Sequence, residues 1–204
     1  SLAQEIGKAV HRVSPSTKVG LMSSIPSVHC AEGRDWKGIL KGLAGENPMV
    51  NRPHLPAYGD TSPQYYHWNF NTISRLSIAV VPKTTEIYPE LEDFPHSRFS
   101  KSKSFATYQV ITSSILHSQG ITLNIFDMTG NGVMRSEGYQ KSLAGVKGFA
   151  ERIRKLGLNS EDQTGIKVLF DPCSSYTLHT QTGESISELY PEESFWGGLL
   201  SAYG

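Results

Sequence analysis

The sequence has few cysteines and no excess of either charge. Only two cysteines, Cys30 and Cys173, occur in 204 residues, and they lie far apart in the chain. Because two distant cysteines form neither a disulfide framework nor a metal-binding pattern, we expect thiols in a reducing, cytoplasmic compartment, with no metal or cofactor. Nineteen basic residues match nineteen acidic ones, and a neutral chain without a basic cluster is a poor candidate for binding nucleic acid.

Long hydrophobic runs are also missing. The longest, residues 76–82, is interrupted by Ser77 and is far shorter than the ~20 apolar residues that cross a bilayer. The first five residues lack the basic and then apolar order of a signal peptide. We therefore expect no membrane partner. Because Ser1 leads directly into a helical pattern, we also expect the chain to be a piece of a longer protein.

Hydrophobic periodicity predicts helices that alternate with strands. The predicted helices cover residues 2–13, 36–45, 64–80, 102–118 and 139–157. The predicted strands lie near residues 19–22, 50–54, 84–91 and 121–126. In the third strand Ile87 and Leu91 face one side, whereas Tyr88, Glu90 and Glu92 face the other. This alternation is typical of βα units on a parallel sheet, so the predicted fold class is α/β. Residues 24–34 are predicted to form a polar loop.

The C-terminal part follows a polar linker at residues 159–164. One strand is predicted at residues 166–170 and one helix at residues 192–203. A single strand and a single helix do not make a domain. We therefore expect residues 1–158 to form one domain and residues 165–204 to begin a second.

Candidate site residues lie where the predicted strands end, because parallel βα folds place their reactive groups there. The third strand ends in Glu90 and Glu92. Charged side chains on the inner face of a buried strand need partners or a function, and a carboxylate there can attack as a nucleophile or transfer a proton. The alternative is an edge strand with a solvated acidic face. The other strand ends contribute Arg52, His54, Tyr58, Asp127 and Asn131.

Residues 84–127 resemble the β-galactosidase-like glycoside hydrolases of family 42 and related families of clan A. In that family a strand ends in a Glu that is followed shortly by Pro, and a helix and a Gly-led strand come next. Here Glu92-Asp93-Phe94-Pro95 matches the first element. Gln109 in the following helix and residues 120–127 match the rest in order and type.

The resemblance implies that residues 1–158 are strands five to eight of a (β/α)8 barrel, followed by the start of a doubly wound domain. It implies a retaining glycoside hydrolase that cleaves β-galactoside-like bonds. Glu92 would be its nucleophile, and the acid/base Glu would lie on the fourth strand, outside this chain. The family's Trp after the nucleophile and its motif after the last strand are replaced here by residues 97–99 and 127–131, which leaves the sugar open.

Further expectations follow from this assignment. Carbohydrate would contact Arg52, His54, Tyr58, Glu90, Asp127 and Asn131. Half a barrel exposes two unpaired strand edges, so we expect the chain to self-associate or to pair with the missing barrel half, and to be inactive alone. The alternative is a non-catalytic βα protein whose acidic strand end binds a carbohydrate or another partner.

Overall fold

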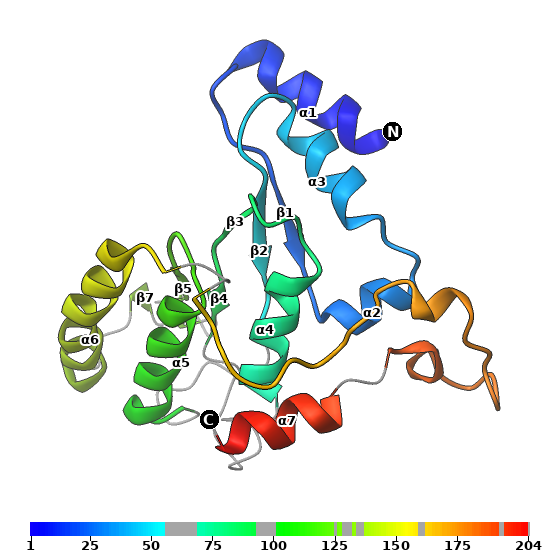
Figure 1. Ribbon diagram of the computed structural model, residues 1–204. Helices are drawn as coiled ribbons and strands as arrows, with labels where there is room; N and C mark the ends of the chain where they lie inside the picture. The colour runs from blue at the N-terminus through cyan, green and yellow to red at the C-terminus, as the bar shows by residue number, and fades with distance from the viewer. Residues whose placement is uncertain are drawn as a thin grey trace.

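The computed structural model describes residues 1–55, 69–92, 101–124, 126–127, 132–133, 137–158, 162–191 and 194–203. A small parallel sheet lies between helices of different lengths (Figure 1). In this part of the chain, none of the helices combines the length and the apolar character needed to cross a membrane.

Six helices confirm the predicted helical periods, although α4 begins eight residues after the predicted start at residue 64, and residues 64–68 lie outside the described residues. They are α1 (Leu2–Val13), α3 (Trp36–Ala44), α4 (Thr72–Ala79), α5 (Lys103–Ile115), α6 (Glu137–Leu156) and α7 (Ser194–Tyr203). Three of them begin with a capping side chain that accepts a backbone N–H: Ser1, Asp35 and Ser102. Gly45 ends α3 with φ 57°, a backbone angle that glycine adopts readily.

Helices α1 and α3 pack closely because glycines face each other. A Cβ on Gly7 would lie 2.6 Å from the carbonyl oxygen of Gly42, which is closer than carbon and oxygen can approach. The two helices form the upper end of the molecule in Figure 1.

Helix α2 (Pro26–Ala31) corrects the prediction of a loop at residues 24–34. It has only six residues, too few to show an apolar period. Pro26 occupies its first turn, where a missing N–H costs nothing. The His29 side chain then ties both of its ends: Nε2 accepts from the Ser24 amide at 2.9 Å, and Nδ1 lies 2.8 Å from Glu32 Oε2.

The four predicted strands form parallel ladders in chain order. The ladders join β1 (Gly20–Ser23), β2 (Val50–Pro53), β3 (Glu86–Ile87), β4 (Glu90–Leu91) and β5 (Thr122–Leu123). Strand β2 pairs with both β1 and β3, β4 pairs with β5, and a parallel bridge from His54 to Glu90 connects β2 to β4. The predicted strand at residues 84–91 is therefore two short strands, separated at Tyr88 and at Pro89, which has no N–H to donate.

An antiparallel hairpin follows the parallel strands. It pairs β6 (Phe126–Asp127) with β7 (Gly132–Val133). Only a single strand was predicted at residues 121–126, so this hairpin was not expected. The fold is mixed α/β, as predicted, but short parallel sheets of this kind do not by themselves make half of a (β/α)8 barrel.

The sheet has one apolar face and one polar face. Ile87 and Leu91 are buried in two core clusters, with Leu40 of α3 and Phe105 of α5 among their neighbours. This confirms the predicted direction of Ile87 and Leu91. Alternation sends the intervening residues to the other face, where the exposed fraction of Met22 in β1 reaches 64%. The polar face is therefore the more accessible one.

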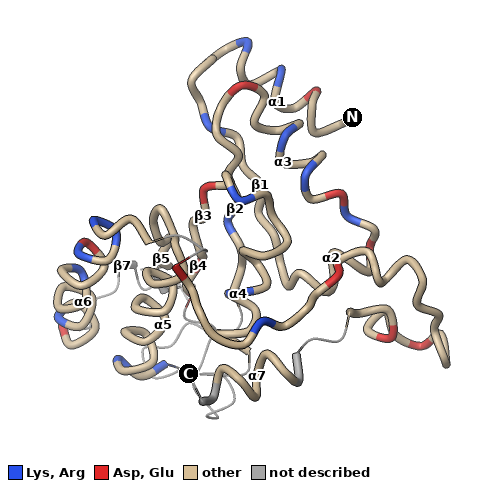
Figure 2. The backbone as a smooth tube through the Cα atoms, viewed as in Figure 1, with Lys and Arg blue, Asp and Glu red and all other residues tan. Residues whose placement is uncertain are grey.

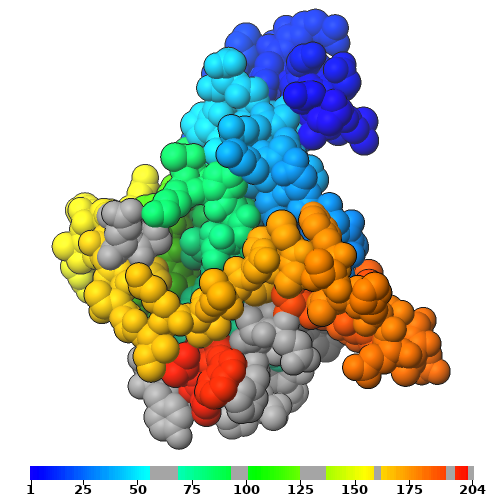
Figure 3. Space-filling model, turned by 45° about the vertical axis from the view of Figure 1, so that its right-hand side comes forward, coloured from blue at the N-terminus to red at the C-terminus, as the bar shows by residue number. Residues whose placement is uncertain are grey.

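The C-terminal segment does not begin with a strand. Residues 166–170 form no β-ladder within the described chain, so the predicted strand is wrong. Residues 162–191, called the C-terminal belt below, run across the molecule (Figure 3). The belt's short 3₁₀ helices, η2 (Ser174–Tyr176) and η3 (Ile186–Leu189), contact α2, and α7 contacts α4. Residues 166–170 have the alternation of a strand, but they pair with no described strand and instead run extended beside α4.

Candidate functional site

The carboxyl ends of β2 and β4 bring four of the predicted site residues together. Arg52 and His54 come from β2 and its end, and Glu90 and Glu92 come from β4 and its end. Charged residues of both signs gather where β2, β3 and β4 lie side by side (Figure 2). Tyr58 and Asn131 lie outside the described residues. Only the backbone of Asp127 is described, in β6, so its predicted role is not placed.

Glu90 is held in an ion pair with Arg52. Its residue is 7% exposed, and its Oε1 contacts Arg52 Nη2. The guanidinium is itself positioned from two sides, because Nε donates to Thr122 Oγ1 at 3.4 Å and Nη1 approaches Met22 Sδ at 3.2 Å. Thr122 in turn donates to the carbonyl of Pro89 at 2.9 Å. Side chains from β1 and β5 thus hold the cation of β2 beside the buried carboxylate.

Glu92 lies beside the buried Glu90, and its acidity is weakened as a result. A hydrogen bond with Glu90 raises the pKa of Glu92 to about 7, and burial and the negative charge of Glu90 add to the effect. The positive charges of Arg52 and Lys101 act in the opposite direction but do not cancel it. The Glu92 side chain is 22% exposed. An accessible carboxyl near half protonation at neutral pH is suited to chemistry.

Two further basic groups border Glu92. His54 Nε2 lies 4.0 Å from Glu92 Oε2. Lys101 is buried, donates its Nζ to the backbone carbonyl of Glu92 and lies 5.9 Å from the ring centre of Phe105. Sequence reasoning missed Lys101, because it stands nine residues after Glu92 in no recognisable spacing. It also missed Thr122, although Thr122 could have been found from the strand alternation that puts it beside Glu90.

The arrangement limits the chemistry that Glu90 and Glu92 can do together. The two carboxyls project from the same strand toward the same side and bond each other. They cannot stand on opposite sides of a substrate bond, as the two carboxyls of a glycosidase do. Glu92 can act on a substrate in either of two forms: protonated, with its proton shared with Glu90, or ionised. Among the described residues, no group of three His, Cys, Asp or Glu side chains is placed to hold a metal ion.

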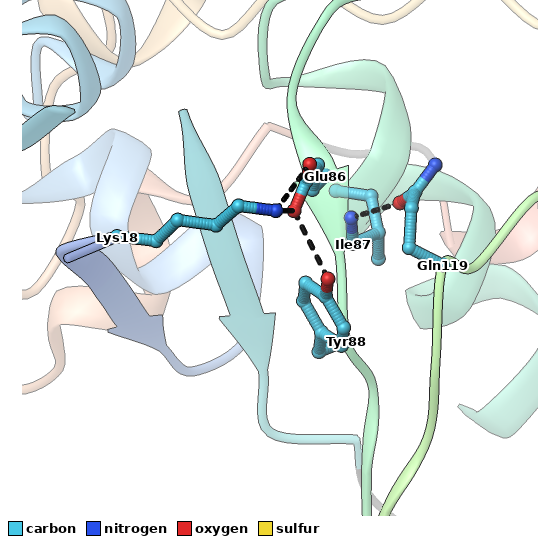
Figure 4. Close-up of polar contacts among 5 residues, drawn as sticks. All are labelled: Lys18, Glu86, Ile87, Tyr88 and Gln119. Carbon is cyan, nitrogen blue, oxygen red and sulfur yellow. Dashed lines mark hydrogen bonds and ion pairs between the residues drawn. The ribbon is translucent and has the colours of Figure 1, made fainter. Parts of the chain in front are cut away.

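A second charged cluster lies at the amino end of the same polar face (Figure 4). Lys18 reaches across β2 and places Nζ 2.8 Å from both carboxylate oxygens of Glu86 in β3. Tyr88 donates its hydroxyl to Glu86 Oε2 at 3.0 Å. Lys18 and Tyr88 lower the pKa of Glu86 against the opposing effect of burial. Glu86 is therefore a fixed charge in a structural ion pair.

Comparison of this chain with protein-family models, with curated proteins and with solved structures gives no match.

Proposed function

We propose that the Glu90–Glu92 site is the nucleophile side of a retaining glycoside hydrolase acting on β-galactoside-like bonds. The observation that carries the proposal is the carboxyl pair at the ends of parallel strands. One member is locked to Arg52, and the other is accessible with a pKa of about 7. The sugar class rests on the resemblance of residues 84–127 to that hydrolase family.

The proposed roles follow from the contacts. Arg52 and Glu90 position Glu92, and His54 lies near its second oxygen. Ionised Glu92 would attack the anomeric carbon, so that a glycosyl–enzyme bond forms as the bond to the leaving oxygen breaks. A carboxylic acid outside this chain would protonate the leaving oxygen. The same group would then deprotonate the water that releases the sugar and restores Glu92.

The proposal includes the second half of a (β/α)8 barrel. Supporting it, the strands are parallel, neighbour one another in chain order and carry helices between them. The polar face would be the barrel interior. Within the described residues β1 pairs only with β2 and β5 only with β4, so each has an open edge that a missing half or a second copy would cover.

The pH dependence of turnover tests the role of Glu92. A nucleophile must be ionised, so kcat/KM for an aryl β-galactoside should rise with pH through about 7. A fall through the same range would assign Glu92 as a proton donor and contradict the proposed role. The assay belongs on the complete protein, because the proposal places the acid/base outside residues 1–204.

Covalent trapping gives a second, independent test. A 2-deoxy-2-fluoro β-galactoside with a good leaving group should add one sugar to the peptide that contains Glu92, as measured by mass spectrometry. Glu92→Gln should abolish the adduct, whereas Glu86→Gln should keep it, because Glu86 lies at the other end of the sheet. Saturable sugar binding without turnover or adduct would instead support the non-catalytic carbohydrate-binding alternative.

A further inference from the structure

A cavity of about 390 Å³ lies between α4 and the C-terminal belt, away from the Glu90–Glu92 site. Its size falls in the range of small-molecule pockets, ~300–1,000 Å³. Its floor includes Ile87 of β3 and Leu116 at the end of α5, and Gly197 of α7 closes one side. Elements from four parts of the chain therefore build it.

The walls of the cavity are apolar. Ile166, Val168 and Phe170 line it from the belt, whereas Leu169 does not and is 94% exposed. Ile166 is 78% exposed and Val168 is 40% exposed, so this row borders the cavity and leaves it open to solvent on that side. The opposite wall comes from α4 and the residues after it: Leu76, Ile78, Ala79 and Val81. A ligand with an aliphatic or aromatic body would lie between these two rows, with one side toward solvent.

Two buried hydroxyl groups in the lining have no hydrogen-bond partner in the described structure. They are Oγ1 of Thr72, a residue 3% exposed, and Oγ1 of Thr85, a residue 4% exposed. Burying a polar group without a partner is costly, and native proteins rarely do so. A bound ligand that accepts or donates a hydrogen bond would remove this cost.

The charged groups among the described lining residues are basic. Arg75 and Lys83 line the cavity, and none of the described lining residues is Asp or Glu. Arg75 lies one turn after Thr72, so their side chains are neighbours on α4. Its Nε donates to Asn71 Oδ1 at 3.1 Å, and the described structure places no carboxylate against its guanidinium.

We infer that the cavity binds a small amphipathic carboxylate. Its carboxylate head would lie at the start of α4, against Arg75 and Thr72, and its apolar body would run along α4 beneath Ile166 and Phe170. The inference does not depend on the glycosidase proposal, because none of the lining residues belongs to the Glu90–Glu92 site.

Titration calorimetry of this chain with sodium octanoate and with octanol tests the inference. Octanoate should bind saturably and at least about tenfold more tightly than octanol, because only the carboxylate can pair with Arg75. Arg75→Met should weaken octanoate binding about tenfold and leave octanol binding unchanged. Arg12→Met, an exposed arginine of α1, is the matched control and should change neither.

Two more variants keep the test decisive. Thr72→Val preserves shape and fold and should weaken octanoate several-fold. Ala79→Trp adds a large side chain to the lining and should weaken binding of both probes, with folding checked by circular dichroism. Equal affinity for octanoate and octanol, undiminished binding to Ala79→Trp, or no saturable octanoate binding would each overturn the inference.

Discussion

The two ends of the polar sheet face use carboxyl groups in opposite ways. At the amino end Glu86 has a cation of its own, since Lys18 contacts both of its oxygens at 2.8 Å. At the carboxyl end Glu90 and Glu92 depend mainly on Arg52. The pKa of Glu86 is lowered, whereas the pKa of Glu92 is raised to about 7.

This difference arises on neighbouring residues of one chain segment and on one face of the sheet. The number of carboxyls for each cation, more than the burial of either cluster, decides whether the pKa of a carboxyl is lowered or raised. One carboxyl for each cation gives a fixed charge and a stable contact. Two carboxyls for one nearby guanidinium leave a proton at neutral pH, and that proton makes the carboxyl end the candidate for chemistry.

The largest expected effect separates the two ends by activity. In the complete protein, Glu92→Gln should lower kcat/KM for an aryl β-galactoside by at least ~1,000-fold, about 4 kcal/mol of barrier, because an amide cannot act as the nucleophile. Glu86→Gln should change it by less than about tenfold, the range of an indirect effect. Equal losses in the two variants would break the distinction drawn between the ends.

Removing the cation from each end should change stability unequally. Arg52→Met leaves the buried carboxylate of Glu90 without its partner and should lower the free energy of unfolding by about 3 kcal/mol. Lys18→Met removes a cation whose side chain is 46% exposed, so about 1 kcal/mol or less is expected. Urea unfolding at pH 7 measures both. A larger loss for Lys18→Met would contradict the assignment.

The pH dependence of stability should have opposite signs at the two ends. Between pH 4.5, the ordinary pKa of Glu, and about 7, folded Glu92 keeps a proton that the unfolded chain has released. Its contribution therefore lowers the free energy of unfolding as the pH rises through this window, by about 2 kcal/mol for a partly exposed group. Glu86 has a lowered pKa, so its stabilisation is present above the ordinary pKa and is lost as the pH falls.

Unfolding of three proteins across pH 4–8 checks this sign difference. Glu92→Gln should be more stable than the parent at pH 8 and similar to it at pH 4. Glu86→Gln should be less stable than the parent at pH 8, with the deficit shrinking toward acid pH. Parallel curves for the parent and Glu92→Gln would show that Glu92 titrates normally.

The smallest expected effect concerns the Tyr88 hydroxyl at the amino end of the sheet. Tyr88→Phe removes the hydroxyl that donates to Glu86 at 3.0 Å and should cost about 1 kcal/mol of stability. It should also raise the pKa of Glu86, which an NMR titration of the side-chain carboxyl can follow, because that hydrogen bond favours the charged form. An unchanged titration would mean that Lys18 alone sets the charge.

Periodicity was sufficient for most of the fold because buried faces dictate it. The helices α3 and α5 and the strand faces of Ile87 and Leu91 follow from apolar spacing and are buried in the core. Helix α1 also follows from apolar spacing, although Leu2 and Val13 on it are exposed. Helix α2 could not be found this way, because His29 and Pro26 determine it through local contacts. The strand predicted at residues 166–170 has the right alternation, but alternation cannot say whether a partner strand is present.

The sequence also predicted part of the candidate site. Strand ends in a parallel sheet meet at one edge, and this placed Arg52, His54, Glu90 and Glu92 together. Glu90, predicted among the carbohydrate contacts, is 7% exposed and paired with Arg52. Lys101 reaches the site from a separate segment, and no local pattern in the sequence encodes such a contact.

The order of the parallel strands has a consequence for how the chain folds during synthesis. Each strand pairs with one that lies 30 to 36 residues further along, as Met22 does with Arg52, Asn51 with Ile87 and Glu90 with Thr122. The sheet can therefore grow one strand-and-helix unit at a time as the chain leaves the ribosome, without waiting for a distant partner. Arg52 emerges before the carboxylates that it neutralises, and the belt closes over α4 only after the sheet beneath it is complete.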